Sequence, residues 1–135
     1  MAIQRGDAKY KLRPMARIKR GDIIGLFYSA TKTGYIAVFS HDQARRTTLL
    51  YPSRRTESAS IAAKHQAPLP DGAVVEQGTG CEWFVAVFSD KPLSLKTLSA
   101  QIAESHHVNN SCNLILDIKD ARTVRVLPLR YYDKP

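Results

Sequence analysis

The sequence predicts a mainly β protein of about seven short strands, a single β-sandwich or a partly closed barrel, with one α-helix near the C-terminal third. Two apolar segments lead to this prediction, GYIAVFS at 34–40 and EWFVAVFS at 82–89, because both read as strands with two apolar faces. Both are rich in β-branched and aromatic residues, and shorter segments, most of them bounded by turn residues, surround them. We therefore expect the matched segments to be central strands, in two facing sheets or as neighbours in one sheet.

Side-chain alternation along these segments predicts which residues share a face. In the first, Ile36 and Val38 oppose the face that carries Ala37 and Phe39. In the second, the only tryptophan, Trp83, shares a face with valines, which favours a place in the core. The functional alternative is an aromatic at the rim of a groove, in the company of Tyr28, Tyr35 or Tyr51.

The remaining elements are expected from turn signals and periodicity. One helix is expected over 94–107, with Ser94 as N-cap and Leu95, Leu98 and Ile102 on its apolar face, laid over one edge or end of the sandwich. The chain is expected to be one domain over 1–135, with 1–8 and 131–135 frayed. Further strands are expected at 23–30, 47–51, 113–118 and 124–130, with short strand pieces at 60–63 and 67–69 inside the long polar segment 52–80.

The tripeptide Arg-Gly-Asp occurs twice, in IQRGD at 3–7 and IKRGD at 18–22, each time before a segment that reads as a strand. Glycine supplies backbone freedom and aspartate accepts backbone hydrogen bonds, which are the needs of a tight turn. We therefore interpret both copies as turns and not as adhesion signals.

The charge balance bears on partners. Twenty Lys and Arg against twelve Asp and Glu give a net charge of +8 and a pI near 9.7, which favours polyanions and anionic surfaces.

No apolar run is long enough to span a membrane, and the N-terminus lacks the apolar centre of a signal peptide. A native start at Met1 favours the cytoplasm, whereas a fragment of an exported protein implies an extracytoplasmic place, so localisation stays open.

The two cysteines, Cys81 and Cys112, lack the spacing of a zinc site and are expected to be buried free thiols, with a disulfide and a reactive cysteine as alternatives. A cysteine hydrolase could in principle combine Cys112 with His106 or His107. These residues crowd together at the C-terminal end of the expected helix, where capping explains them better. We expect no metal, no cofactor and no enzymatic activity.

A series of motifs between 19 and 93 resembles a known family. It comprises Gly21-Asp22, TGYIAVFS at 33–40, LLYPSR at 49–54, Leu69-Pro70 and GTGCEWFVAVFSDKPL at 78–93. This order is similar to that of an uncharacterised bacterial accessory domain, the domain of unknown function 4384 family. The resemblance implies an immunoglobulin-like sandwich in a non-catalytic module joined to protein kinases, caspase-like peptidases or membrane-anchored regulators.

What the resemblance carries over is structural: the strand of Tyr35, the turn at Tyr51-Pro52 and the strand of Glu82. The chain departs from the family in an arginine-rich loop over 45–55, where a glycine-containing hairpin is expected. Arginine and tyrosine are frequent anchors of protein interfaces. We therefore expect a partner-binding surface at Arg45, Arg46, Tyr51, Arg54 and Arg55.

The function expected from these observations is a non-catalytic protein-binding or regulatory accessory module in a bacterial signalling or effector system. The alternative is a nucleic-acid or anionic-polymer binding protein that uses its basic surface, and a cysteine hydrolase ranks behind both. The sequence leaves the partner and the oligomeric state open.

Overall fold

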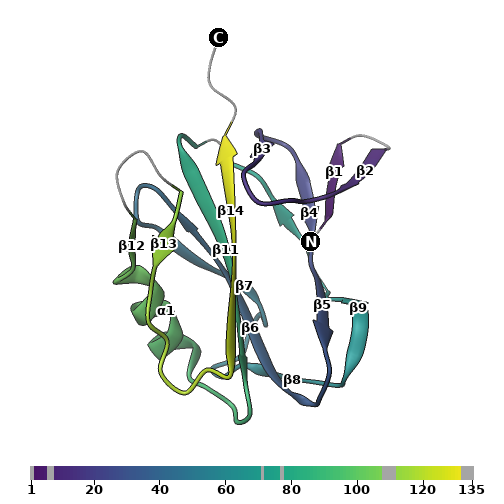
Figure 1. Cartoon of the computed structure of the whole chain (residues 1–135), viewed down its shortest axis with the longest axis vertical. Helices are drawn as coiled ribbons and strands as arrows, with labels where there is room; N and C mark the ends of the chain where they lie inside the picture. The colour runs from purple at the N-terminus through teal and green to yellow at the C-terminus, as the bar shows by residue number, and fades with distance from the viewer. Residues whose placement is uncertain (1, 6–7, 71, 77, 108–111, 132–135) are drawn as a thin grey trace.

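A six-stranded sheet forms the centre of the fold, and a second β layer packs on its inner face (Figure 1). The computed structural model describes residues 2–5, 8–70, 72–76, 78–107 and 112–131. Within these residues the protein is mainly β with a single helix, so the predicted β-sandwich with one helix is confirmed. The strand order in the large sheet is β3 (Ala16–Ile18), β14 (Thr123–Tyr131), β11 (Cys81–Ser89), β6 (Gly34–Asp42) and β7 (Thr47–Tyr51), with β8 (Ala59–Ile61) also paired to β6.

The two matched apolar segments are β6 and β11, and they are antiparallel neighbours in one sheet. Their register runs from Glu82 opposite Asp42 to Ser89 opposite Tyr35. The sequence left open whether the two segments lie in facing sheets or are neighbours in one sheet, and the structure shows that they are neighbours. The alternation is as predicted, because Ile36 contributes to the core on the inner face of the sheet and Trp83 to the core on the outer face.

The second layer consists of two short sheets. One has the order β10 (Ala73–Val74), β4 (Ile23–Gly25), β1 (Ala2–Arg5) and β2 (Ala8–Lys11), and the other pairs β5 (Phe27–Ala30) with β9 (Lys64–Pro68). The strand expected over 23–30 is interrupted at Leu26, which is buried and whose carbonyl accepts a hydrogen bond from the Leu69 amide. Between the layers lies an apolar core that includes Ile24, Leu26, Phe84 and Leu129.

The outer face of the large sheet is covered by α1 (Leu95–Ala103). Ser94 caps the helix by accepting a hydrogen bond from the Thr97 amide at 3.3 Å, as predicted. The buried helix residues are the expected ones, Leu95, Leu98 and Ile102, but the helix lies on a sheet face and not at an edge or end.

The helix is shorter than predicted at its C-terminal end. It ends at Ala103 because the Ser105 side chain and amide both donate to the Ile102 carbonyl and the chain then leaves the helix. Residues His106–His107 form β12, which pairs with β13 (Leu114–Ile115). The strand predicted over 113–118 is thus reduced to two residues.

Cys81 and Cys112 form a disulfide, with their Cα atoms 5.7 Å apart. The expectation of two free thiols is wrong, and one of the alternatives, the bridge, holds. The indole N–H of Trp83 donates to the Cys112 carbonyl at 2.6 Å, so the same segment is attached twice to β11. Trp83 is fully buried, which confirms its predicted place in the core.

The second Arg-Gly-Asp copy is a turn, as predicted. Gly21 has a φ of 92°, and the buried Asp22 side chain accepts a hydrogen bond from the Lys19 amide at 2.9 Å. Gly6 and Asp7 of the first copy lie outside the described residues. Several residues expected to be frayed are instead in strands: 2–5 form β1 between β2 and β4, Ala8 begins β2 and Tyr131 ends β14. Residues 1 and 132–135 lie outside the described part of the chain.

Candidate functional site

A groove of about 540 Å³ opens between β5 and β14, at the edge of the sandwich. Its position follows from the sheet register, in which the small Ala86 of β11 stands opposite Arg125 of β14 on the inner face of the large sheet. A methyl group and an outward-reaching cation fill little space between the two layers. Apolar side chains form the walls of the groove: Phe27 and Tyr28 from β5, Phe84 and Phe88 from β11, and Leu127 from β14.

One side of the groove is an open strand edge. Along β14, β11 pairs with residues 123–130, whereas β3 pairs only with Leu129, Arg130 and Tyr131 on the other side. Among the described residues, no strand pairs with that second side over 123–127. Such an edge presents unpaired N–H and C=O groups that can accept another strand.

The backbone groups that face this opening can be assigned from Pro128. Its carbonyl accepts a hydrogen bond from the Met15 amide at 2.7 Å, on the side of β14 away from β11. Backbone groups of alternate residues point to the same side of a strand. The N–H and C=O groups of Val124 and Val126 therefore face the opening. Proline within a strand is itself typical of an edge.

Arg125 is a groove cation without a partner among the residues that the structure describes. Its side chain is exposed, and within the described part of the chain it forms no hydrogen bond or ion pair. The neighbouring cation, Arg122, is engaged: its Nη1 lies 2.7 Å from Asp90 Oδ1 and also donates to the Thr33 carbonyl. The two arginines therefore differ in their capacity to meet a ligand.

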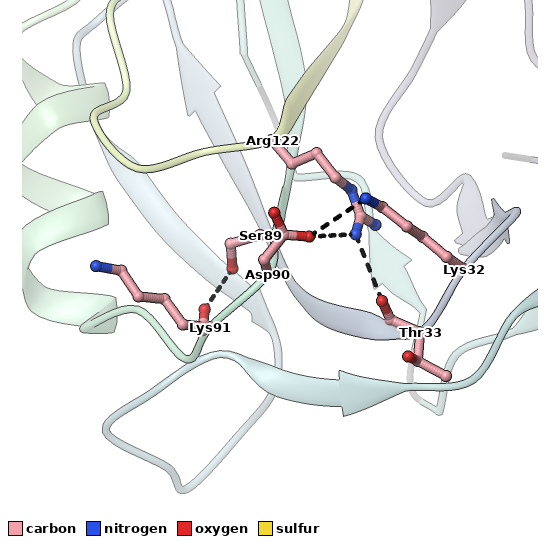
Figure 2. A network of polar contacts seen from close by, with 6 residues as sticks. All are labelled: Lys32, Thr33, Ser89, Asp90, Lys91 and Arg122. Atoms are coloured by element: carbon pink, nitrogen blue, oxygen red, sulfur yellow. Dashed lines mark hydrogen bonds and ion pairs between the residues drawn. The ribbon is translucent and has the colours of Figure 1, made fainter.

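A network of polar contacts around Asp90 includes Arg122, which lines the groove (Figure 2). These contacts join the turn after β5, through Lys32 and Thr33, to the end of β11 and the start of β14. Lys32 Nζ lies 3.8 Å from Asp90 Oδ1. The hydrogen bond from Arg122 holds the pKa of the Asp90 carboxyl below its usual value.

The structure places the arginines predicted to bind a partner at opposite ends of β7. Arg45 and Arg46 lie in the β6–β7 turn, where Arg45 donates to the Ser105 carbonyl at 3.3 Å and Arg46 Nε lies 2.9 Å from Asp42. Arg54 and Arg55 follow β7 and line a hollow of about 500 Å³. The two arginines of each pair are neighbours in sequence, but the two pairs lie at different ends of the strand and do not form one cluster.

The fifth residue of that predicted surface, Tyr51, is half-buried at the end of β7. It packs against the core between the two layers. Part of its ring is therefore needed for packing, which limits the area that a partner could contact.

A half-buried acid that was not among the predicted site residues lies on the inner face of the large sheet. Glu82 accepts a hydrogen bond from the Tyr131 hydroxyl, beside a pocket of about 390 Å³ that Asp42 and Arg46 also line. Burial raises the pKa of the Glu82 carboxyl, and the hydrogen bond from Tyr131 opposes that rise. Strand alternation could have indicated this position, because Glu82 lies two residues before Phe84 and therefore points to the same inner face of the sheet.

The structure supplies no thiol for a cysteine hydrolase, since Cys112 is bonded to Cys81. His106 is exposed in β12, while the side chain of His107 lies outside the described residues. In the described part of the chain, no group of three or more His, Cys, Asp or Glu side chains is arranged to hold a metal.

A family model matches residues 17–92, which is more than half of the chain, and carries the description "Domain of unknown function (DUF4384)". The chain belongs to this family. The matched region of the DUF4384 domain runs from β3 to the end of β11 and includes β5, one wall of the groove. The other wall, β14, and the second cysteine, Cys112, follow the matched region.

No curated protein and no solved structure matches this DUF4384 chain. Its one described helix, α1, is too short to cross a membrane, and no other described segment forms a helix that could.

Proposed function

We propose that this DUF4384 domain is a non-catalytic protein-binding or regulatory accessory module of a bacterial signalling or effector system, and that it holds its partner in the β5–β14 groove. The observation that supports this most directly is the open edge of β14 beside an apolar groove. A protein partner can satisfy both features, because it offers backbone groups to the edge and apolar side chains to the walls.

The exposed aromatic Phe27 gives the groove an anchor. It stands at the groove wall on β5 with 43% of its surface exposed. A large aromatic that binding would desolvate is the kind of residue that dominates protein interfaces. We therefore expect replacement of Phe27 to lower the affinity for a partner more than replacement of the other side chains of the groove.

A capture experiment tests this proposal. Lysate of the native host is passed over immobilised wild type, Phe27→Asp and Ile23→Asp, and bound material is eluted in steps of rising salt. Ile23 is the matched control, since it is 47% exposed on β4 and does not line the groove. Circular dichroism and thermal melts establish that the variants are folded.

We expect one specific protein to be held to high salt by wild type and Ile23→Asp, and to be lost from Phe27→Asp. Retention of the same protein by Phe27→Asp would contradict a role for the groove. Nucleic acid that leaves at low salt from all three proteins, with no protein retained beyond it, would support the polyanion alternative, because phosphate contacts weaken steeply with salt.

A further inference from the structure

We propose that the groove binds an extended peptide that adds to β14 as a strand and that carries an apolar residue and a carboxylate two positions apart. This inference rests on the proposed protein-binding function and specifies the chemistry of the partner segment. The steps below use the backbone of β14, the side chains beside it and their charges.

The backbone of β14 sets the mode of binding. Val124 and Val126 present their N–H and C=O groups to the opening, and no described strand uses them. A peptide in extended conformation can bond to these groups with its own N–H and C=O groups. Its backbone then continues the large sheet beyond β14, next to the walls of the groove.

The side chains of β14 set the spacing. Leu127 and Arg125 are two residues apart and lie on the same inner face of the sheet, opposite Phe84 and Ala86. An added strand has the same period of two. The peptide residue beside Leu127 therefore meets the apolar wall, and the residue two positions along meets Arg125.

The charge of Arg125 determines which type of peptide residue is favoured beside it. Arg125 has no partner among the described residues, whereas Arg122 already binds Asp90. A carboxylate matches the guanidinium in shape and charge. The net charge of +8 also favours approach of an acidic segment.

These features favour a peptide over a nucleic acid. A nucleic-acid backbone would need several cations spaced along the groove, but its lining contains two arginines, one of which is engaged by Asp90. The walls are mainly aromatic and aliphatic, and the open edge offers amide and carbonyl groups that suit another strand.

Fluorescence anisotropy with labelled peptides tests the inference. The probe is Thr-Val-Thr-Glu-Thr-Val-Thr, in which the valines and the glutamate share one face of an extended chain. A matched probe has lysine in place of glutamate. Two further probes carry N-methyl groups on alternate residues, one at odd and one at even positions, so that each removes the N–H groups from one edge of the peptide.

We expect the glutamate probe to bind wild type at least about ten-fold more tightly than the lysine probe, which corresponds to one charge-assisted contact. Arg125→Glu should reverse this preference. Arg130→Glu is the matched control, because Arg130 is exposed on the same strand but faces the other way and does not line the groove. It should leave the preference unchanged.

We also expect one N-methylated probe to bind at least about ten-fold more weakly and the other to bind within about three-fold of the parent probe, since only one edge of the peptide faces β14. Equal binding of both N-methylated probes would overturn strand addition, even if the charge preference holds. These probes alter the peptide and not the protein, so loss of folding cannot explain the result.

Two outcomes separate this inference from the proposed function. Wild type that binds no probe, but captures a protein in a manner dependent on Phe27, would overturn the peptide chemistry and leave the protein-binding role standing. A concentration-dependent dimer of the free protein, observed by sedimentation and lost in Arg125→Glu, would assign the edge to a second copy and overturn the inference.

Discussion

The Tyr131 hydroxyl, at the end of β14, donates a hydrogen bond to the Glu82 carboxylate, near the start of the neighbouring strand β11. The two residues are diagonal neighbours on its inner face, since Glu82 stands opposite Leu129. Burial is the main cause that raises the pKa of Glu82, and burial together with Glu82 raises the pKa of Tyr131. The pair is therefore a polar contact that links stability to pH.

Replacing Glu82 with glutamine should flatten the dependence of stability on pH. Because the pKa of Glu82 is raised in the folded protein from its ordinary value of 4.5, its contribution to stability is present below that value and is lost as the pH rises through the higher folded pKa. Thermal melts at pH 4, 6 and 8 should show Glu82→Gln gaining on wild type with rising pH. The exposed Glu57→Gln is the control, and a constant difference between Glu82→Gln and wild type at all three pH values would refute the prediction.

Removing the Tyr131 hydroxyl should destabilise the protein at neutral pH. Tyr131→Phe keeps the ring but takes one donor from the Glu82 carboxylate, which costs about 1–2 kcal/mol in the free energy of unfolding. Urea denaturation at pH 7 measures this cost. In the Glu82→Gln background the cost should be smaller, and equal costs in both backgrounds would show that the two side chains are not coupled.

Loss of the disulfide should lower the free energy of unfolding by about 3–4 kcal/mol, the loop-closure value for a separation of 31 residues. The test compares urea denaturation of wild type with that of the Cys81→Ser, Cys112→Ser double variant. Thiol titration of denatured, unreduced wild type should find no free thiol. Two titratable thiols in that sample would restore the interpretation that the sequence favours.

The arginines predicted to bind a partner should contribute unequally. Arg45 and Arg46 are already bonded to Ser105 and Asp42, whereas Arg54 and Arg55 form no ion pair among the described residues. Double alanine variants of the two pairs can be compared by titration of any captured partner. We expect the Arg54, Arg55 variant to lose more affinity. Unchanged affinity in both variants would remove these arginines from the interface.

Gly34 should not tolerate a side chain, even the methyl group of alanine. A Cβ atom at this position would lie 2.7 Å from the Ser89 carbonyl oxygen, and a backbone atom cannot easily move away. Gly34→Ala should therefore lower the free energy of unfolding by about 1–3 kcal/mol. Its exposed neighbour serves as the control, because Thr33 uses its carbonyl and not its side chain to bind Arg122. A melt of Gly34→Ala that matches that of Thr33→Ala would disprove the clash.

Local patterns determined the elements of this protein. The alternation in β6 and β11, the Ser94 cap and the apolar spacing of α1 are properties of short segments, so the sequence predicts them and the structure confirms them. The turn at Gly21-Asp22 is equally local. The sandwich follows from these elements, because each has an apolar face that must be covered.

Tertiary structure alone decided which distant residues meet. The pairing of β11 with β14 brings Glu82 to Tyr131 and Ala86 beside Arg125, and the path after α1 returns Cys112 to Cys81. The length of β7 separates two arginine pairs that are close in sequence. Spacing along the chain does not encode these distances, because they depend on strand order and register, which are set by the packing of the whole core.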